Sequence, residues 1–201
     1  MRSLLRSLLN ALGVLAALPF VLWAKFGLAL LGTKRFYMDA IYAVALVPGT
    51  PGMLIRRGFY NLVLAECAWD LDMHFGSAIT QPEARIARGV WIGAYSLLGK
   101  VRIGEDVLVA SRVSVLSGAR AHAFDDPSRP VNEQEGVLAD VTIGSGSWLG
   151  EASVVMADIG AGCVVGAGSV VTKPVEDGAI VAGNPARILR KRGETGSPSS
   201  S

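Results

Sequence analysis

Residues 137–173 read VLADVTIGSGSWLGEASVVMADIGAGCVVGAGSVVTK, and this stretch decides the fold. Large aliphatic residues recur in it at intervals of six, and a glycine follows four of them. A small or β-branched residue stands two positions before each aliphatic. The aliphatic positions are Ile143, Leu149 and Val155, followed by Ile159, Val165 and Val171. The small or β-branched positions are Val141, Ser147, Ser153, Ala157, Cys163 and Ser169. The stretch is therefore a six-residue repeat.

A repeat of this length predicts a coiled sheet. It does not match the 3.6-residue period of an α-helix, and it is too short for a strand–helix unit. Residues two apart on a strand point the same way, so the aliphatic residue and its small partner both face the interior. The glycine suits a corner at which a side chain would clash or φ must be positive. One hexad buries no core, so stacked coils must provide the stability.

The same pattern extends upstream, where the sequence VWIG at 90–93 opens it. Leu97 or Leu98 takes the next aliphatic position, and Phe75-Gly76 is a candidate irregular first hexad. Two intervals fall short of whole hexads, by one residue before Ile103 and by two before Ile159, and each predicts a tightened corner. The other upstream positions are Val109 and Val115, with inward partners Val90, Val101, Val107 and Val113.

Residues 75–190 resemble the hexapeptide-repeat acyltransferases, the family that includes galactoside and maltose acetyltransferases. The resemblance implies a left-handed parallel β-helix with three hexads in each triangular turn, although the general crossover preference is right-handed. It also implies a homotrimer whose sites lie between neighbouring subunits. The predicted fold is therefore mainly β, with a β-helix at 71–175 that follows an apolar α-helical region at 1–70.

The composition fits one main domain with a smaller appendage in 201 residues. A net charge of +2 leaves no basic footprint for a nucleic acid, so we expect no such partner. The mean hydropathy of +0.42 is high, and much of the excess lies in the first 65 residues, which directs attention to a membrane or a buried interface. Cys67 and Cys163 form no metal or redox motif, and Cys163 occupies an inward slot of the repeat.

An uncharged apolar run extends from Leu8 to Ala24. Its length lies at the lower edge of what spans a bilayer. A signal peptide is disfavoured because no clean small-x-small cleavage site follows, and a buried oligomerisation helix remains an alternative. We expect membrane association at the cytoplasmic face of the inner membrane, through a flat helix, a re-entrant helix or a span. Trp23 and Lys25 suit interfacial anchors.

Two further helices are expected, at Phe36–Leu46 and Met53–Cys67, with a break at Pro48–Gly52 between them. The order VPG…GMLIRRGFYNLVL…C…D resembles the N-terminal region of acyltransferases found in exopolysaccharide and capsule pathways. This second resemblance bears on the acceptor. It implies a hydroxyl of a sugar or of a lipid-linked polysaccharide intermediate.

The repeat is interrupted by a polar excursion at 117–136. Residues 117–135 read SGARAHAFDDPSRPVNEQE, contain no hexad and include two prolines, so they should leave the coil as a loop. A long loop in a compact repeat domain is usually functional or disordered. This loop contains His122, and a lone loop histidine is ordinarily a solvated surface group.

The surroundings of His122 resemble those of the galactoside-type acetyltransferases. In that family IG-x-x-V-L-[IV]-A-x-x-V leads into a loop in which a histidine follows a Thr/Ser-Gly turn, and here IGEDVLVASRV at 103–113 leads into SGARAH at 117–122. The resemblance implies that His122 is catalytic. A neutral imidazole can accept the proton of a hydroxyl as it attacks the thioester of acyl-CoA. No Ser-His-Asp set is readable, which favours direct transfer over an acyl-enzyme.

Three charged loop residues are candidate substrate contacts. Asp125 and Asp126 are candidates for orienting the imidazole or binding the acceptor, with a solvated turn before Pro127 as the alternative. Arg120 is a candidate contact to an acidic acceptor. His74, at the start of the coil, is expected to be structural or exposed.

The family resemblance places coenzyme contacts on the later coils. Trp148 is expected to point outward, where the family has a tryptophan beside the coenzyme groove, and trimer packing is the alternative role. Further contacts are implied at Ala167, Thr172 and Lys173. Glu151 departs from the family, which usually has a serine at this position.

The segment 176–192 is basic. Its residues AGNPARILRKR at 182–192 match the family's closing pattern G-x-P-A-[RK]-x-[IL]-[RK]. Arg187 and Arg190 suit the phosphates of CoA, and a basic helix that caps the stack is compatible with this role. Residues 193–201 are expected to form a disordered tail.

The sequence therefore predicts an O-acyltransferase, most simply an O-acetyltransferase that uses acetyl-CoA and no metal. A zinc site of the γ-carbonic-anhydrase type needs three histidines, and this chain has two. Two alternatives remain open. One is a non-catalytic β-helix scaffold for assembly, and the other is an acyltransferase whose donor is an acyl-carrier protein.

Overall fold

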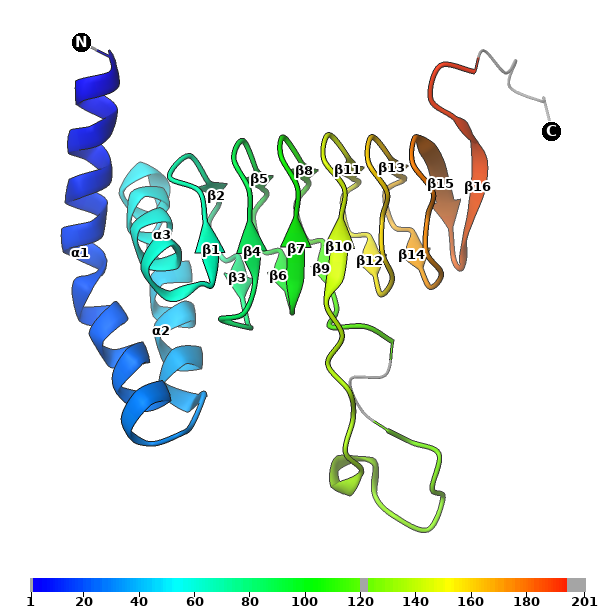
Figure 1. The fold of residues 1–201 in the computed structure, drawn as a ribbon, viewed down its shortest axis with the longest axis horizontal. Helices are drawn as coiled ribbons and strands as arrows, with labels where there is room; N and C mark the ends of the chain where they lie inside the picture. Colours follow the sequence, from blue (N-terminus) through cyan, green and yellow to red (C-terminus); the bar gives the residue numbers. More distant parts are fainter. Residues whose placement is uncertain (1, 120–122, 195–201) are drawn as a thin grey trace.

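The computed structural model describes residues 2–119 and 123–194, except the side chains of residues 2 and 3. The chain forms a parallel β-helix of about six turns, capped at one end by three helices (Figure 1). Each turn contributes short strands to parallel sheets that run the length of the coil, and the predicted fold class is confirmed.

We name the three sheets face A, face B and face C. Face A consists of β1 (Glu66–Cys67), β4 (Arg85–Ile86), β7 (Val101–Ile103) and β10 (Val141–Ile143). Face B consists of β2 (Asp72–Met73), β5 (Trp91–Ile92), β8 (Leu108–Val109), β11 (Trp148–Leu149), β13 (Val164–Val165), β15 (Ala179–Gly183) and β16 (Ala186–Lys191). Face C consists of β3 (Ala78–Ile79), β6 (Leu97–Leu98), β9 (Ser114–Val115), β12 (Val154–Val155) and β14 (Val170–Val171).

The predicted aliphatic column forms the core. All six aliphatic positions of the 137–173 stretch are at most 1% exposed, and the inward Cys163 is 0% exposed. Leu98 takes the inward position that the sequence left open, because it is fully buried while Leu97 is 44% exposed. Each buried large side chain of this kind stabilises the fold by about 1.5–3 kcal/mol.

Two sets of glycines shape the coil for different reasons. At the four positions where a glycine follows the aliphatic residue, the next coil leaves no room for a side chain: a Cβ on Gly144 would lie 2.3 Å from the Ala161 nitrogen. The positive φ angles fall two residues later, as at Gly146, where φ is 67° and no atom lies within 4 Å of an added Cβ. The repeat glycine is therefore required because a side chain there would clash with the next coil. A different residue, two positions later, adopts the positive φ of the corner.

The coil begins earlier than the sequence predicted. The helix expected at Met53–Cys67 ends at Val63, and Cys67 lies in the first strand, β1. Met73, Ile79 and Ile86 extend the core column into these first turns, and each is at most 2% exposed. Phe75, the candidate for an irregular first hexad, packs edge-on against Tyr95 at a corner, with a ring-centroid distance of 5.6 Å.

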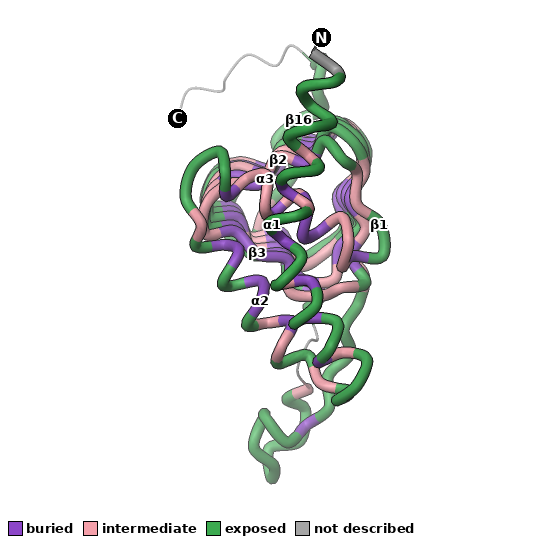
Figure 2. The backbone as a smooth tube through the Cα atoms, turned by 90° about the vertical axis from the view of Figure 1, so that its left-hand side faces the viewer, coloured by how far each residue is buried: buried purple, intermediate pink, exposed green. Residues whose placement is uncertain are grey.

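The N-terminal cap contains α1 (Arg2–Leu30), α2 (Arg35–Ala45) and α3 (Gly49–Val63). The second helix was predicted well. The break after it is shorter than expected, because Gly49–Gly52 already belong to α3 and only Leu46–Pro48 lie between the helices. Helices α2 and α3 lie between the coil and α1, and burial is concentrated on the inward sides of the cap (Figure 2).

Side chains of the cap satisfy the open edges of the first turn. Tyr37 donates to the Ile79 carbonyl at 2.8 Å, and the Ile79 N–H donates to the Tyr60 hydroxyl at 3.0 Å. Arg57 donates through Nε to the Leu71 carbonyl at 2.7 Å. Exposed strand edges invite pairing with other chains, and these helices cover this one.

Arg56 joins the cap to the coil from a fully buried position. Its guanidinium donates to the carbonyls of Met73, Val44 and Val47 at 2.9, 3.0 and 2.8 Å. The last two carbonyls lie at the C-terminal end of α2, where a cation is favoured by the helix dipole. Burial lowers the pKa of Arg56 from its ordinary value.

A β-hairpin caps the other end. Strand β15 pairs in parallel with β13 as a further turn of the coil, and β16 pairs with β15 in antiparallel fashion. The basic segment 176–192 is thus strand and turn, and the capping helix considered for it is wrong. The Arg192 side chain adds a bond to the Gly162 carbonyl at 3.0 Å. Most of the predicted tail, residues 195–201, lies outside the described residues.

Candidate active site

The irregular intervals of the repeat all fall at one edge of the prism, where face C passes to face A. The intervals across the other two edges are six residues in every turn, as in Ile143–Leu149–Val155. Across this third edge the intervals between inward residues are 7, 5, 28, 4 and 4. They run from Ile79 to Ile86, Leu98 to Ile103, Val115 to Ile143, Val155 to Ile159 and Val171 to Val175. Both predicted tightened corners lie here, and so does the excursion, which we call the edge loop (Figure 1).

The base of the edge loop is fixed to the coil. The Lys100 N–H donates to the Ser117 hydroxyl at 2.8 Å, and the Ala139 N–H donates to the Ser117 carbonyl at 3.0 Å. Where the chain returns, Asp140 accepts from Arg102 at 2.6 Å and lies 3.3 Å from the Lys100 ammonium. Arg102 holds the pKa of Asp140 below its usual range. Both ends of the loop are therefore held against face A.

The described part of the loop is organised around Gln134, which is 8% exposed. Its amide nitrogen donates to the carbonyls of Asp126 and Arg129 at 2.8 and 2.9 Å, and its amide oxygen accepts from the Asp126 N–H at 3.1 Å. Gln134 could not be recognised from the sequence, because one glutamine in a polar loop carries no signal of burial. This side chain fixes the shape of the segment that follows the predicted catalytic histidine.

The predicted loop residues divide into described and undescribed positions. His122 and Arg120 lie outside the described residues. Asp126 closes a turn, because its carboxylate accepts from the Ser128 hydroxyl at 2.6 Å and the Ser128 N–H at 2.9 Å. The Ser128 hydroxyl lowers the pKa of Asp126 from its usual value. Asp125 lies beside it on the exposed surface of the loop.

Face B carries a continuous apolar column on its outer surface. Trp148 points outward as predicted and is 47% exposed. It lies in register between Leu108 on one neighbouring strand and Val164 on the other. Trp91 and Ile180 extend the column at its two ends. Exposed contiguous apolar side chains on a sheet indicate a surface that binds a partner.

Two predicted basic contacts lie on the same face as Trp148. Arg190 pairs in register with Ile180, and Arg187 pairs with Ala182. Residues that pair across antiparallel strands project to the same side of the sheet, so both arginines extend the outer column of face B. Both are exposed, and their guanidinium groups bond to carbonyls of their own segment. The hairpin thus places cationic side chains at the C-terminal end of an apolar stripe.

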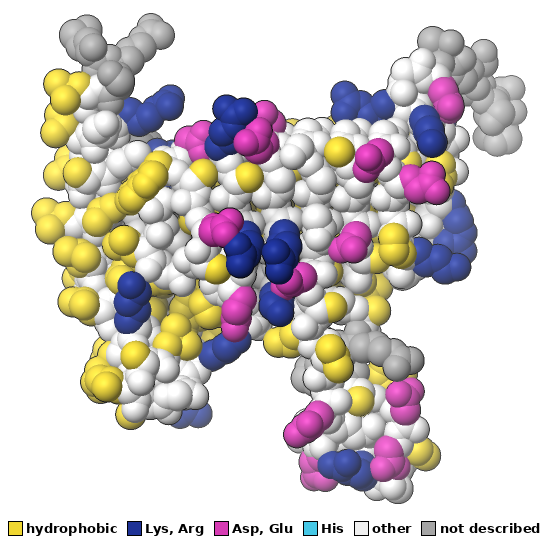
Figure 3. Space-filling view, viewed as in Figure 1, with side chains coloured by type: hydrophobic (Ala, Val, Ile, Leu, Met, Phe, Trp, Pro, Cys, Tyr) yellow, Lys and Arg dark blue, Asp and Glu magenta, His cyan; other side chains and the backbone are white. Residues whose placement is uncertain are grey.

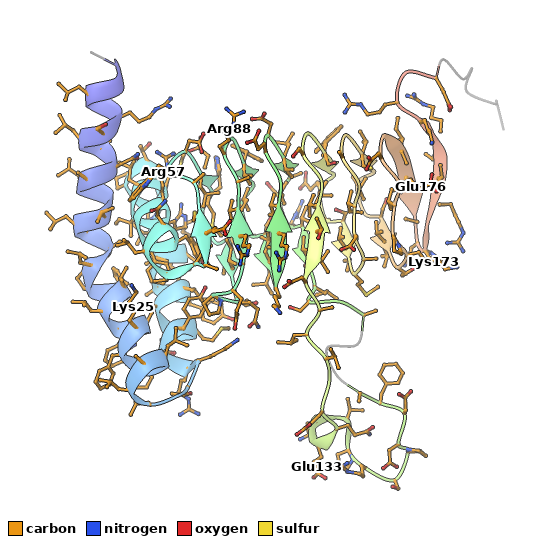
Figure 4. All side chains as sticks on the ribbon, viewed as in Figure 1. Lys25, Arg57, Arg88, Glu133, Lys173 and Glu176 are labelled. Carbon is orange, nitrogen blue, oxygen red and sulfur yellow. The ribbon has the colours of Figure 1, made fainter. Side chains whose placement is uncertain are left out.

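The remaining predicted coenzyme contacts lie elsewhere on the coil. Ala167 is exposed at the edge between faces B and C. Thr172 and Lys173 are exposed at the end of β14, on the edge that also carries the edge loop, and Lys173 is labelled in Figure 4. Within one chain these residues do not line a common groove with Trp148. A single subunit therefore places Trp148, Arg187 and Arg190 on one face, with β13 and β15 between the tryptophan and the arginines, and it places Thr172 and Lys173 on another edge.

Glu151, which departs from the family pattern, pairs with Arg112 at the edge between faces B and C. Both side chains are at least half exposed. The ion pair occupies the edge next to Trp148, so a carboxylate with its counter-ion stands where the family usually has a hydroxyl.

A large, mainly apolar groove lies far from all of these positions. It has a volume of about 1010 Å³ and runs between α1 and the first coil. Its walls are mainly apolar, with Val14, Leu15 and Leu18 on the helix and Trp69 on the coil. None of the predicted site residues lines it. No group of three or more histidine, cysteine or acidic side chains suited to a metal occurs among the described residues.

Comparison with solved structures relates this architecture to known proteins. A maltose O-acetyltransferase from Clostridium difficile 630 superposes with a TM-score of 0.66 at 20% identity, over 81% of this chain and 88% of that one. The fold is that of the hexapeptide-repeat acyltransferases. AntD, an N-acyltransferase from Bacillus cereus solved with dTDP and 3-hydroxybutyryl-CoA, superposes with a TM-score of 0.52 at 18% identity, over 68% of this chain and 88% of that one.

A variant of AntD in complex with dTDP-4-amino-4,6-dideoxyglucose and coenzyme A gives the same TM-score of 0.52, at 18% identity over 69% of this chain and 90% of that one. At these identities the similarity concerns the fold. No family model matches the chain, and no curated protein matches it in sequence.

Proposed function

We propose that the protein is an O-acyltransferase that moves an acetyl group, or another short acyl group, from acyl-CoA to a sugar hydroxyl. The observation that carries the proposal is the edge loop. A coil with the fold of the hexapeptide-repeat acyltransferases is interrupted once, and the interruption contains His122 behind the IGEDVLVASRV and SGARAH motifs. The anchored base of the loop and the internal bonds of Gln134 support a loop with a defined shape.

In this mechanism His122 acts as a general base in a ternary complex. The acceptor oxygen attacks the thioester carbonyl carbon while the imidazole takes the hydroxyl proton. The new C–O bond forms and the C–S bond breaks, and the proton passes from the imidazolium to the departing CoA thiolate. General base catalysis of this kind contributes about 10²–10⁴-fold to the rate.

The coenzyme is proposed to lie along face B. The outward Trp148 offers an apolar surface to the pantetheine arm, and the exposed Arg187 and Arg190 suit its phosphates. The proposal assigns Ala167, Thr172 and Lys173 to the same coenzyme from a neighbouring subunit. AntD, which shares the fold, has been solved with coenzyme A and with an acyl-CoA.

The surface of the coil supports a homotrimer. The outer positions of face A are polar, and they include Glu66, Arg85 and Arg102 in ion pairs. The mixed charges of this face are visible in Figure 3. Outer positions on face B are mainly apolar, and face C presents Leu97, Val154 and Val170. Two different apolar faces on one prism are what a closed ring of head-to-tail contacts requires.

In such a ring, face B of one subunit meets face C of the next. Trp148, Arg187 and Arg190 would then face the strand end that carries Thr172 and Lys173 in the neighbour. The separation of these residues in one chain therefore becomes a groove in the trimer. The proposal also places the edge loop at the rim of this groove, where Asp125, Asp126 and Arg120 can contact the acceptor.

The acceptor is proposed to be a sugar or a lipid-linked polysaccharide intermediate at the cytoplasmic face of the inner membrane. The helix Leu4–Leu30 is long and apolar enough to cross a bilayer. Among proteins of this fold, one is a maltose O-acetyltransferase and another was solved with a sugar nucleotide. A non-catalytic scaffold and a carrier-protein donor remain the alternatives.

The test is release of CoA thiol from acetyl-CoA by the full-length protein with a panel of free sugars and lipid-linked glycans. We expect the His122→Ala variant to lose at least about 10²-fold in turnover while its melting temperature is unchanged. His74→Ala is the matched control, since the His74 ring packs at a tilt of 54° against Trp91 with a centroid distance of 4.6 Å, and His74 has no proposed catalytic role. Equal rates for wild type and the His122 variant would remove the histidine from the mechanism. Turnover with acyl-carrier protein but not with acyl-CoA would change the donor.

A further inference from the structure

The outer side of α1 is wholly apolar, and no helix or strand among the described residues covers it; near its C-terminal end Trp23 and Phe26 pack against Phe36 of α2. Its exposed large hydrophobic residues fall on one half of the helix at 3.6 residues per turn. No polar or charged side chain interrupts this half of the helix. The exposed residues are Leu4, Leu5, Leu8, Leu12, Leu15, Leu22, Trp23, Phe26 and Leu30, each at least 46% exposed. We call this surface the α1 outer face, and it forms the hydrophobic end of the molecule in Figure 3.

The opposite side of α1 packs against α2 and α3. Ala17 and Ala24 are 0% exposed, and the backbones of α1 and α3 approach so closely that a Cβ on Gly13 would lie 2.4 Å from the Leu54 carbonyl oxygen. A Cβ on Gly58 of α3 would lie 2.7 Å from the Val14 nitrogen. Near the end of α1 a Cβ on Gly27 would meet the Phe36 side chain at 2.4 Å. Contact therefore extends along most of the helix.

This packing distinguishes a flat helix from a span. A spanning helix must present apolar side chains to lipid around its circumference, or pair with other spanning helices. The inner side of α1 instead carries Asn10, which donates to the Trp69 carbonyl at 3.2 Å and accepts from Arg57 at 3.0 Å. To span, α1 would have to leave α3 and expose these groups to hydrocarbon.

Charge complements the apolar face. Residues 1–48 contain five basic residues and one acidic residue, Asp39. The basic residues are Arg2, Arg6, Lys25, Lys34 and Arg35. Lys25 is exposed and makes no ion pair with any described residue, whereas Arg6 is exposed on the side of α1 that lines the groove toward the first coil. Trp23 packs against Phe36 with a centroid distance of 4.7 Å. Basic residues and aromatic rings flanking an apolar face are typical of a helix that lies in the interface of an anionic membrane.

We propose that the α1 outer face docks flat on an anionic lipid bilayer, so that the β-helix stands end-on with its C-terminal hairpin away from the membrane. The orientation follows from the fold, because α1 runs across the N-terminal end of the coil and perpendicular to its axis (Figures 1 and 2). In a trimer with parallel coils, three α1 outer faces share one plane.

The orientation has a consequence for the acceptor, and this step rests on the proposed function. Trp148 lies three coils above the first turn, or roughly 14 Å at about 4.8 Å per coil. Two layers of helices of about 8–10 Å each separate that turn from lipid. The coenzyme groove therefore lies roughly 30 Å above the bilayer, whereas the headgroup region is only about 5–8 Å deep. A lipid-linked acceptor must carry a glycan long enough to reach it.

Vesicle flotation of the full-length protein tests the docking. We expect binding to phosphatidylglycerol vesicles, weaker binding to phosphatidylcholine vesicles, and at least about tenfold less binding by a Leu8→Glu/Leu22→Glu variant. Val137→Glu is the matched control, since Val137 is 72% exposed just after the edge loop and far from α1. Binding that survives the double substitution, or no binding to either vesicle, would overturn the proposal. Coenzyme A affinity, measured by calorimetry, should be equal in all variants, so a failure of docking is separable from a failure of the proposed enzyme.

Depth measurement separates a flat helix from a span. Single-tryptophan variants at Leu8, Leu15 and Leu22, with all native tryptophans replaced by phenylalanine, are mixed with lipids brominated at different acyl positions. A flat helix places the three probes at the same shallow depth, whereas a span places Leu15 deepest. A protein that retains only Trp148 should show no quenching. Quenching of Trp148 or a deepest Leu15 would refute the end-on arrangement.

Discussion

Tyr37 and Tyr60, from two different helices, hydrogen-bond the two main-chain groups of one residue, Ile79. Tyr37 donates to its carbonyl and Tyr60 accepts from its N–H, at 2.8 and 3.0 Å. Both tyrosines are 0% exposed. Ile79 lies in β3, the last strand of face C at the capped end, so its main-chain groups have no further strand to pair with. The cap therefore completes the sheet with side chains.

Tyr37→Phe and Tyr60→Phe should each destabilise the protein by about 1–3 kcal/mol, because each leaves a buried main-chain group without its partner. Chemical denaturation followed by circular dichroism measures the effect. Tyr42→Phe is the control, because Tyr42 is 49% exposed, and it should change stability by less than about 0.5 kcal/mol. Equal stability of Tyr37→Phe and wild type would show that water replaces the phenol.

Stability should fall as the pH rises through the alkaline range. Burial raises the pKa of Cys67 to about 12, and burial raises the pKa values of Tyr37 and Tyr60 further above their ordinary range. The unfolded chain releases these protons between about pH 8.5 and 10, while the folded chain retains them. The stabilisation is present below this range and is lost as the pH rises, because the folded state binds more protons.

Melting temperatures at pH 8, 9, 10 and 10.5 measure this dependence. The decline should be shallower in Tyr60→Phe, which removes one of the groups that titrates only on unfolding. A Tyr42→Phe variant should follow the wild-type curve. Parallel curves for Tyr60→Phe and wild type would assign the alkaline loss of stability to other groups.

The two glycines of one corner should respond differently to alanine. Gly144→Ala places a Cβ 2.3 Å from the Ala161 nitrogen of the next coil, and the stacked backbones cannot separate locally. We expect a loss of about 3 kcal/mol, the upper end of the usual cost of overpacking. Gly146→Ala meets no atom within 4 Å but adopts a φ of 67°, so it should cost about 1–2 kcal/mol. Denaturation midpoints compare them, and the reverse order would contradict the two roles.

The inward column could be predicted from the sequence because its buried residues recur every six positions. The hexads from Val90 onward can be recognised without knowing the tertiary contacts, since each aliphatic residue packs on the equivalent residue one turn away. The first turn could not be predicted in this way because it breaks the six-residue spacing and has no coil before it. Its interval from Ile79 to Ile86 is seven residues, and the helices of the cap take the place of a preceding coil.

The sequence did not indicate that the C-terminal segment forms a strand, because this strand depends on pairing with its neighbour. Residues Ala186–Lys191 are basic and unpatterned in sequence, and only their antiparallel register with Ala179–Gly183 makes them a strand. The sequence indicated which residues could form the site but not where in space they would meet. Trp148 and Thr172 lie on different faces, and the sequence of one chain does not state which faces of two chains meet.

Leu108→Glu should dissociate the proposed trimer. Leu108 is 42% exposed and lies between Trp91 and Trp148 in the outer column of face B. A carboxylate there would be buried without a partner in each interface, at a cost of about 3–5 kcal/mol. Sedimentation velocity in detergent should show a monomer for this variant and a trimer for wild type. Thr142→Glu on the polar face A is the control and should remain trimeric. A trimeric Leu108→Glu variant would exclude face B from the interface.

Gln134→Ala should reduce turnover without unfolding the coil. The substitution removes the three hydrogen bonds that join Gln134 to Asp126 and Arg129 within the edge loop. The loop lies outside the core, so the melting temperature should change by no more than about 2 °C. A loop that positions a catalytic base imprecisely loses about 10–10²-fold in kcat.

The turnover assay compares this variant with two others. Gln134→Glu keeps the side-chain shape but loses both donors, so it should resemble the alanine variant. Val131→Ala is the control within the loop, because the Val131 side chain is 50% exposed and the bond from the Gln134 N–H to its main-chain carbonyl, at 3.2 Å, is kept by alanine. Wild-type kcat in both Gln134 variants would contradict this prediction. It would show that the shape that Gln134 gives to the loop does not affect the chemistry proposed for His122.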